Sequence, residues 1–245
     1  MWVNGCLVLL CAAEFLVSLL SEKILDIAVS IWLGFAMFDH LDLLNGAGFR
    51  VIPRNTSGAV LDFIGEQHYR EGNPRGKVIA CYLDPTSQIY PQKFRRPDGK
   101  WPFAGALVLG GGCAYAAPIG RNHLVEVHDL NLDLEELTRG EIVTELGLTM
   151  INRVAVVPEL KGFGIGSALA RAARRYAPRL FPGAQFVEVM TTRRLRDARA
   201  IAAGTYLKRD FLQLAGFTVA PTISSERRSG GERTGMLYYF APVSA

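Results

Sequence analysis

A β-branched run that breaks into three alternating glycines and resumes as an alanine-rich segment constrains this chain more than any other feature. The stretch 153–175 reads RVAVVPELKGFGIGSALARAARR. Its first part is apolar enough for a central strand, and Pro158 ends the pairing on one side because proline has no N–H to donate. Its last part has the composition of a helix that stops at Pro178. The stretch therefore predicts a strand, a glycine loop and a helix in immediate succession.

A unit of this kind is an anion-binding site. The first N–H groups of a helix have no acceptor within the helix, and the helix dipole adds positive potential at the same end. Glycines at positions 162, 164 and 166 carry no Cβ atom that would hold a phosphate away from these amides. The spacing G-x-G-x-G is not the G-x-G-x-x-G of a dinucleotide fold, and Gly166–Ser167 lacks the lysine of a P-loop. The loop is predicted to bind a phosphate ligand of another class.

The chain from residue 49 onward has the pattern of an α/β domain, in which short β-branched runs alternate with helical segments. Strands are expected at 49–53, 77–83, 103–112, 151–157, 184–192 and 235–243. Helices are expected at 57–69, at 167–178 and, with a break near Gly204, at 194–217. The segment 121–150 alternates polar and apolar residues, and its last part, from 138, is interpreted as the lead-in to the strand at 151.

The first 48 residues differ from the rest. Two apolar runs, 5–20 and 27–38, are both shorter than the roughly 20 clean apolar residues of a membrane span, and Glu14 interrupts the first. No basic segment or small-residue cleavage site marks a secretory signal. Three interpretations stay open: helices packed on the domain, a membrane anchor or hairpin, and an extension without a folded role. We therefore divide the chain into an apolar helical N-terminal segment, 1–48, and a domain, 49–245.

Charge and cysteine usage narrow the partners and the compartment. Residues 1–48 carry a net charge of −4, which leaves +8 on the rest of a chain whose total is +4. A basic domain suits a polyanion such as a nucleotide cofactor or nucleic acid. The four cysteines form no C-x-x-C pair and the four histidines are scattered, so no metal site is predicted. Buried thiols indicate a reducing compartment, and we expect a cytoplasmic protein, with membrane association through 1–48 as the alternative.

The loop itself resembles that of a known superfamily. Residues 161–166, KGFGIG, follow VAVVP and match the pattern [R/Q]-x-x-G-x-[G/A] after V-x-P. In this the chain resembles the GCN5-related N-acetyltransferase (GNAT) superfamily, whose loop holds the coenzyme A pyrophosphate and whose preceding splayed strand pairs with pantetheine. The segments 49–69 and 211–217 (FLQLAGF) are also similar to family segments, so the resemblance covers 49–243 in order and is specific over 150–217. It implies an α/β fold with a GNAT-like mixed, mostly antiparallel sheet and flanking helices.

The resemblance also implies a cofactor and its contacts. The cofactor is acetyl-CoA or another acyl-CoA. The implied contacts are Val156, Val157, Lys161, Gly162, Phe163, Gly164, Ile165, Gly166 and Ser167. Lys161 departs from the usual arginine or glutamine, which keeps the charge but loses the bidentate fork of arginine.

The implied activity is an N-acyltransferase that moves an acetyl or related acyl group from coenzyme A to an amine by direct attack in a ternary complex. Such a transfer needs a neutral amine, an N–H donor for the oxyanion and a proton for the leaving thiolate. A strand amide near Val156 or Val157 is the expected oxyanion donor. Glu145 and Glu141, just upstream of the strand, are the candidate general bases.

The thiolate acid is a further departure from the family pattern, because Leu212 stands where many members have a tyrosine. Tyr206 is the candidate in its place. Water and the tyrosines of the closing strand, Tyr238 and Tyr239, are the alternatives.

Two further functions stay open. The basic segment 193–209 could read phosphates of a nucleic-acid acceptor, and HYREGNP (68–74) resembles a helix end in branches near Mom-like DNA-modification proteins and ABC-ATPase-linked GNAT proteins. Leu212 would also suit a non-catalytic acyl-CoA-binding module. The acidic residues between Asp129 and Glu145 could attract a cationic acceptor. The sequence does not identify the amine acceptor. It also leaves both a monomer and a homodimer open.

Overall fold

A mixed β-sheet forms the centre of the domain. The computed structural model describes residues 49–54, 58–67, 75–112, 118–205, 210–221, 224–227 and 233–244. The expectations for 1–48, for 68–74 and for Tyr206 fall outside these residues, so they stay predictions, as does the domain boundary at 48. In the described part of the chain, no helix has both the length and the apolarity that crossing a membrane requires.

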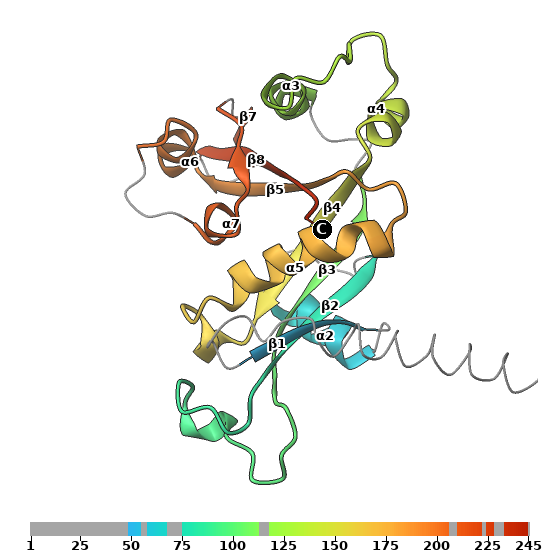
Figure 1. Cartoon of the computed structure of the whole chain (residues 1–245). Coiled ribbons are helices and arrows are strands. Elements are labelled where there is room, and N and C mark those ends of the chain that lie inside the picture. Colours follow the sequence, from blue (N-terminus) through green and yellow to red (C-terminus); the bar gives the residue numbers. More distant parts are fainter. Residues whose placement is uncertain are drawn as a thin grey trace, which may run out of the picture. The chain divides into compact units, whose positions relative to one another are not determined.

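Eight strands of the described residues make up the sheet, in the order β1-β2-β3-β4-β5-β8-β6, with β7 also paired to β8 (Figure 1). The strands are β1 (Phe49–Arg54), β2 (Lys77–Leu83), β3 (Phe103–Gly111), β4 (Leu148–Val156), β5 (Phe186–Arg194), β6 (Thr218–Val219), β7 (Ser224–Arg227) and β8 (Arg233–Pro242). Every pairing is antiparallel except that of β4 with β5, which is parallel. The predicted GNAT-like mixed, mostly antiparallel sheet is confirmed.

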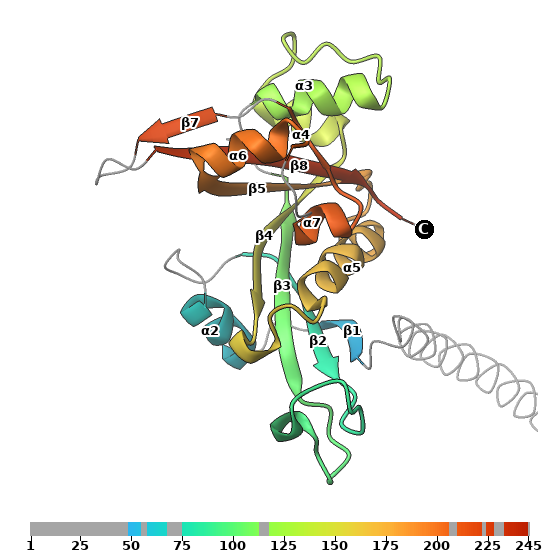
Figure 2. The ribbon, with the colours of Figure 1, turned by 90° about the vertical axis from the view of Figure 1, so that its left-hand side faces the viewer.

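Helices flank the sheet on both faces. They are α2 (Gly58–Gln67), α3 (Pro118–Val127), α4 (Arg139–Glu145), α5 (Ile165–Leu180), α6 (Leu195–Ala202) and α7 (Phe211–Leu214), with short 3-10 helices η1 (Gln92–Phe94) and η2 (Pro158–Leu160). Figure 2 shows α2 and α5 on opposite sides of the sheet. Ile64 of α2 packs with Val78, Val108 and Ala155 on one face, while the buried Tyr176 of α5 donates a hydrogen bond to the carbonyl of Val51 at 3.2 Å.

The segment 121–150 corrects one expectation. Its residues from 138 do not lead directly into the strand, because 139–145 form α4, and 118–127 form α3. A capping box starts α4: the Thr138 side chain accepts from the N–H of Glu141, whose carboxylate accepts from the N–H of Thr138. Ile142 and Leu146, one turn apart, then pack with Leu124 in a common core. In this segment the capping box of Thr138 and Glu141 determines the local structure, and the alternating polar and apolar residues do not form a strand.

The predicted helix over 194–217 is also divided. The first part, α6, ends at Ala202, and Gly204 follows with a φ of +70° that a helix cannot contain. The second part, α7, begins at Phe211 after Asp210, whose carboxylate accepts the N–H groups of Leu212 and Gln213. The expected break near Gly204 is therefore a complete interruption between two helices.

The strands β4 and β5 pair over a short length and then part. Their register covers Leu148 with Phe186, Thr149 with Val187 and Met150 with Glu188, and nothing beyond. From there β4 stays paired with β3 and β5 with β8. Val108 faces Arg153 and Leu109 faces Ile151, which leaves Asn152 as the extra residue of a β-bulge in β4. The bulge and the separation give β4 an unpaired edge on the side of β5.

Candidate functional site

The glycine loop lies between η2 and the first turn of α5. Gly162 and Gly164 have φ values of +94° and +82°, a conformation that L side chains rarely adopt. A Cβ at either position would meet nothing within 4 Å, so the backbone conformation and not the space requires glycine there. Gly166 differs, because its φ is ordinary and an added Cβ would lie 3.4 Å from the ring of Phe211. The backbone conformation therefore requires glycine at 162 and 164, whereas an added methyl group at 166 would be in ordinary van der Waals contact with Phe211.

The first turn of α5 presents free donors at this loop. Gly164 is the N-cap residue, and the N–H of Ala168 donates to its carbonyl at 3.0 Å as the first hydrogen bond of the helix. The N–H groups of Ile165, Gly166 and Ser167 therefore have no acceptor within α5. The helix dipole adds positive potential at the same place. This is the arrangement that binds phosphate.

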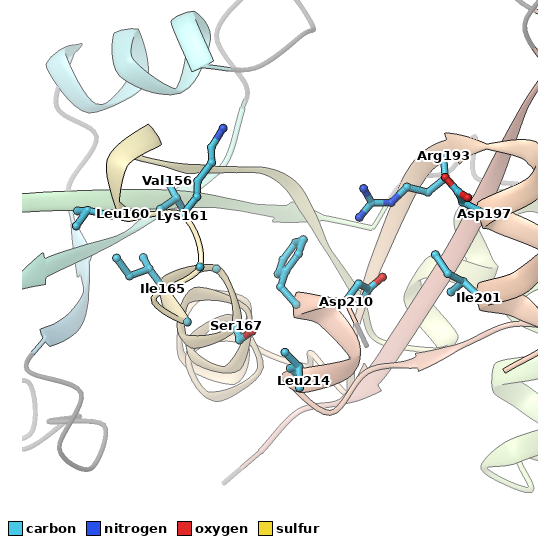
Figure 3. Close-up of a pocket in the computed structure, with 14 residues that line it drawn as sticks. Val156, Leu160, Lys161, Ile165, Ser167, Arg193, Asp197, Ile201, Asp210 and Leu214 are labelled. Atoms are coloured by element: carbon cyan, nitrogen blue, oxygen red, sulfur yellow. The ribbon is translucent and has the colours of Figure 1, made fainter. Parts of the chain in front are cut away.

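A pocket of about 490 Å³ opens in front of these donors (Figure 3). Its lining consists of Val156, Leu160, Lys161, Gly162, Gly164, Ile165, Gly166, Ser167, Arg193, Asp197, Ile201, Asp210, Phe211 and Leu214. Figure 3 shows Lys161 and Val156 on one side of the pocket and Arg193, Asp197 and Ile201, from the end of β5 and from α6, on the other. The structure thus brings together most of the predicted cofactor contacts, while Val157 and Phe163 do not line the pocket.

The unpaired edge of β4 ends at this pocket. Residues of an antiparallel pair point their N–H and C=O groups alternately toward and away from the partner strand. The N–H of Val157 donates to the carbonyl of Ala104 in β3 at 2.9 Å, so it is not free to serve an oxyanion. The alternation then points the backbone groups of Val156 and Val154 away from β3, into the space where β4 and β5 have separated. Of the two expected oxyanion donors, Val156 has the free edge.

The far wall of the pocket is polar. Asp210 caps α7 through one carboxylate oxygen and accepts the hydroxyl proton of Tyr239 with the other. Burial, together with the hydrogen bond to Asp210, raises the pKa of Tyr239 above its ordinary value, and the charge of Arg193 offsets a part of this rise. The hydroxyl proton of Tyr239 is therefore held by Asp210. Leu212, at the usual tyrosine position, is 1% exposed and offers no polar group.

The candidate catalytic carboxylates lie elsewhere. Glu141 and Glu145 belong to α4, and neither lines the pocket. The carboxylate of Glu141 accepts the backbone N–H of Thr138 at 2.8 Å, and hydrogen bonding to the side chain and backbone of Thr138 lowers the pKa of Glu141. Tyr206 is outside the described residues. Their catalytic roles stay predictions, and the structure gives Glu141 a local role as part of a helix cap.

The basic residues near the pocket divide into two groups. On α5, Arg171 donates to the carbonyl of Leu214, and Arg174 donates to the carbonyls of Ala215 and Pro242, at 2.9–3.1 Å. These two arginines close the C-terminal end of α7 and tie α5 to the end of β8. Of the basic residues described in the segment 193–209, Arg193 lines the pocket. Across the described ranges, no group of three His, Cys, Asp or Glu side chains is placed to hold a metal ion.

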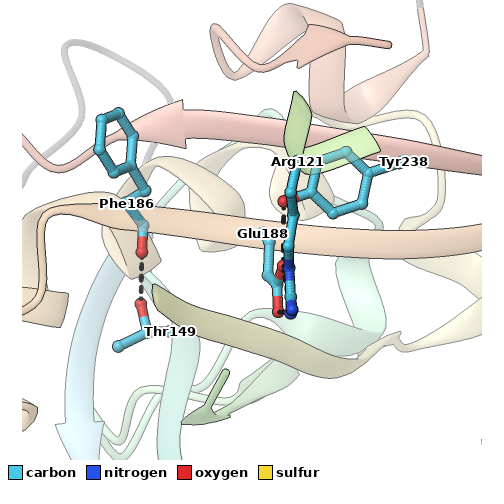
Figure 4. Close-up of polar contacts among 5 residues, drawn as sticks. All are labelled: Arg121, Thr149, Phe186, Glu188 and Tyr238. Carbon is cyan, nitrogen blue, oxygen red and sulfur yellow. Dashed lines mark hydrogen bonds and ion pairs between the residues drawn. The ribbon is translucent and has the colours of Figure 1, made fainter. Parts of the chain in front are cut away.

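A buried ion pair lies where β4 and β5 separate (Figure 4). No sequence motif predicted it. Arg121 of α3 donates to both carboxylate oxygens of Glu188 of β5 at 2.8–3.1 Å, and the Tyr238 hydroxyl donates to the same carboxylate at 2.9 Å. Beside it, the Thr149 hydroxyl donates to the carbonyl of Phe186 at 3.1 Å. A glutamate in the middle of the apolar run FVEVM was the available signal.

Comparisons with known proteins returned solved structures alone. No family model and no curated protein matches the chain. Among the solved structures that match, a nourseothricin acetyltransferase is 16% identical over 80% of this chain and 99% of its own, with a TM-score of 0.41. An acetyltransferase from Bacillus subtilis, in complex with CoA, is 14% identical over 80% and 99%, with a TM-score of 0.38. A putative arylalkylamine N-acetyltransferase 7 from the mosquito Aedes aegypti is 13% identical over 68% and 64%, with a TM-score of 0.36.

Similarity at this level does not assign an activity to the chain. The fold is GNAT-like in its own right, through a mixed sheet whose β4 and β5 part and a glycine loop that joins β4 to α5. Any functional conclusion depends on the pocket at that junction.

Proposed function

We propose that this chain is an acyl-CoA-dependent N-acyltransferase, which moves an acetyl or related acyl group from coenzyme A to an amine. One observation carries the proposal. The free N–H groups at the start of α5 and the unpaired edge of β4 meet at a single pocket of about 490 Å³. A phosphate-binding helix end beside an open strand edge suits a ligand that has both phosphates and an extended amide chain.

The residues of the pocket fit the two halves of acyl-CoA. The N–H groups of Ile165, Gly166 and Ser167 would hold the pyrophosphate, and Lys161 adds a positive charge beside them. The backbone groups of Val154 and the carbonyl of Val156 would pair with the pantetheine amides as an added strand does. Acyl-CoA would supply the acyl group as an activated thioester. The protein supplies the binding and the orientation.

The transfer would proceed by direct attack of the amine in a ternary complex. The N–H of Val156 is the donor we assign to the carbonyl oxygen on which negative charge develops. Glu145 or Glu141 would take the amine proton, directly or through water. Because Leu212 has no proton to give, the leaving thiolate would take one from Tyr206 or from water.

Isothermal titration of acetyl-CoA into the full chain tests the proposal. We expect micromolar binding that is lost in Gly166→Val, because Gly166 lines the pocket, its ordinary φ accepts a side chain, and a branched side chain there would take space from the ligand in front of the free N–H groups of α5. Gly140→Ala is the matched control, since Gly140 lies on α4, has no neighbour within 4 Å of an added Cβ and does not line the pocket. A folded wild-type chain that fails to bind acetyl-CoA would contradict the proposal.

The burial of Leu212 favours one second candidate, a non-catalytic acyl-CoA-binding module. The side chain is 1% exposed in α7, next to the pocket residue Phe211. A panel of amines, including polyamines, aminoglycosides, peptides and nucleic acids, discriminates between the two. Turnover of any of them supports the transferase, whereas binding of acetyl-CoA without turnover supports the module.

A further inference from the structure

The connection between β2 and β3 is unusually long for neighbouring antiparallel strands. Such strands are commonly joined by two to five residues, whereas this connection runs from residue 84 to 102. Its own hydrogen bonds fix its form. The N–H of Leu83 donates to the carbonyl of Pro102 at 2.9 Å and closes the base, and the N–H of Arg96 donates to the carbonyl of Pro85. The connection also contains η1, so it is a defined element of the fold.

This element contacts the segment that carries the glycine loop at two points. The ring of Tyr90 lies 5.5 Å from that of Phe163, centroid to centroid, at an interplanar angle of 52°. Tyr90 is only 3% exposed although it belongs to a surface connection, while Phe163 is 38% exposed. The ammonium group of Lys93 forms an ion pair with the carboxylate of Glu159 in η2. The two contacts fall on either side of Lys161 in the sequence.

The glycine loop needs support of this kind. Gly162 and Gly164 lose more conformational freedom on folding than other residues do, and both adopt a positive φ. Within the loop, the N–H of Phe163 donates to the carbonyl of Leu160 at 3.4 Å, a long hydrogen bond. Neither Tyr90 nor Lys93 lines the pocket. Their contacts therefore restrict the loop from its outer side without meeting a ligand.

We propose that the β2–β3 connection is a buttress that holds the glycine loop in its phosphate-binding conformation, with Tyr90 and Lys93 as positioning residues. This inference rests on the proposed function for the identity of the ligand, coenzyme A, but not for the restriction of the loop. Loss of the buttress leaves the donors of α5 in place, because α5 is packed on the sheet independently, and frees the segment 159–164 in front of them. The cost appears as weaker binding of the phosphate-bearing half of the ligand.

Two measurements on the full chain test the buttress. The first is the dissociation constant for coenzyme A by titration calorimetry, and the second is amide hydrogen exchange of 159–168 without added ligand. We expect Tyr90→Ala to weaken binding about tenfold and to speed exchange in 159–168, while the centre of α5 stays protected. Tyr90→Phe keeps the ring that contacts Phe163 and is expected to stay much closer to the wild type than Tyr90→Ala in both measurements.

A charge variant covers the case in which Tyr90→Ala fails to fold. Lys93 is exposed, so Lys93→Met removes the ion pair without disturbing a core, and we expect it to weaken binding about twofold at low salt. Lys100→Met is the matched control, because Lys100 lies in the same connection and pairs with Asp98 instead. Equal effects of the two lysine variants would count against the buttress.

The outcomes separate the inference from the proposed function. Wild-type protein that fails to bind coenzyme A contradicts the proposed function, and the exchange measurement then decides the buttress by itself. Unchanged exchange of 159–168 in folded Tyr90→Ala overturns the buttress whether or not the ligand binds. Faster exchange confined to that segment, together with rescue by Tyr90→Phe, supports it.

Discussion

Glu188→Gln should strongly destabilise the protein, because it removes the charge of a buried ion pair. The carboxylate of Glu188 is fully buried and receives hydrogen bonds from Arg121, itself 1% exposed, and from Tyr238. Burial by itself would lower the pKa of Arg121, but the hydrogen bonds and the charge of Glu188 more than offset this and raise it. The amide of glutamine preserves the shape of the side chain, removes the negative charge and deprives the buried Arg121 cation of the carboxylate that accepts its hydrogen bonds.

The expected cost follows from that geometry. Breaking a buried ion pair by removing one partner costs about 3–5 kcal/mol, because the remaining charge stays desolvated. A domain of ordinary stability has about 5–15 kcal/mol in total, so the loss is a large fraction of it. The double variant Arg121→Met with Glu188→Met removes both buried charges. Its cost in free energy of unfolding should be far smaller than the sum of the costs of the two single variants.

Urea unfolding followed by far-UV circular dichroism measures these differences, with the free energy of unfolding extrapolated linearly to water. The control is Lys100→Met, which breaks an ion pair of 3.7 Å between largely exposed side chains and should cost less than about 1 kcal/mol. If Glu188→Gln costs no more than Lys100→Met, then the loss of the Glu188 charge does not destabilise the buried Arg121 cation, and the prediction is refuted. A double variant as unstable as the sum of the singles would refute the coupling.

Three further perturbations probe the sheet and the far wall of the pocket. Burial raises the pKa of Cys81 and of Tyr239, whose hydroxyl Asp210 also holds, so the unfolded chain releases these protons at a lower pH than the folded chain. The free energy of unfolding therefore falls, by up to about 1.4 kcal/mol per pH unit and group, once the pH exceeds the unfolded pKa of each group, about 8.5 for Cys81 and about 10 for Tyr239. A flat urea midpoint from pH 8 to 11 would contradict this. Asp210→Ala removes the cap of α7 and the partner of Tyr239, and should lower the free energy of unfolding by about 2–3 kcal/mol. Thr191→Val should raise the free energy of unfolding by about 1 kcal/mol, because the Thr191 hydroxyl is the buried side-chain group left without a hydrogen-bond partner among the described residues. A thermal melt shows whether Asp210→Ala lowers and Thr191→Val raises the stability.

The fold could be predicted from the sequence where signals were local. The run 153–175 shows a strand, a loop and a helix in one continuous pattern, and the structure has β4, η2 and α5 in that order. The helices of 118–145 were missed because their apolar residues also alternate. Only the capping box between Thr138 and Glu141, three residues apart, distinguishes α4 from a strand lead-in. That pattern was present in the sequence.

The side of the pocket formed by the glycine loop could be predicted from the sequence, whereas the side formed by β5 and α6 could not. Lys161 and the glycines are adjacent in the chain, so their pattern can be matched directly. Asp197 and Ile201 reach the pocket because α6 packs on β5 and β8, which no spacing in the sequence expresses. The partner of Glu188 is similarly distant, since Arg121 comes from a helix 67 positions earlier. An apolar strand can show that a carboxylate is buried, but it cannot show which cation neutralises it.

Two distant segments of the sequence meet at the pocket through Gly166 and Phe211. Gly166 belongs to the loop and Phe211 to the segment FLQLAGF, and each resembles its family counterpart separately. In the structure an added Cβ on Gly166 would touch the Phe211 ring at 3.4 Å, and both residues line the same pocket. The capping of α7 by Asp210 sets the position of that ring. A distance of 3.4 Å is an ordinary van der Waals contact, so Phe211 accepts an added methyl group; Phe211→Ala should therefore leave the cost of Gly166→Ala for acyl-CoA binding unchanged, and clearly different costs in the two backgrounds would refute this.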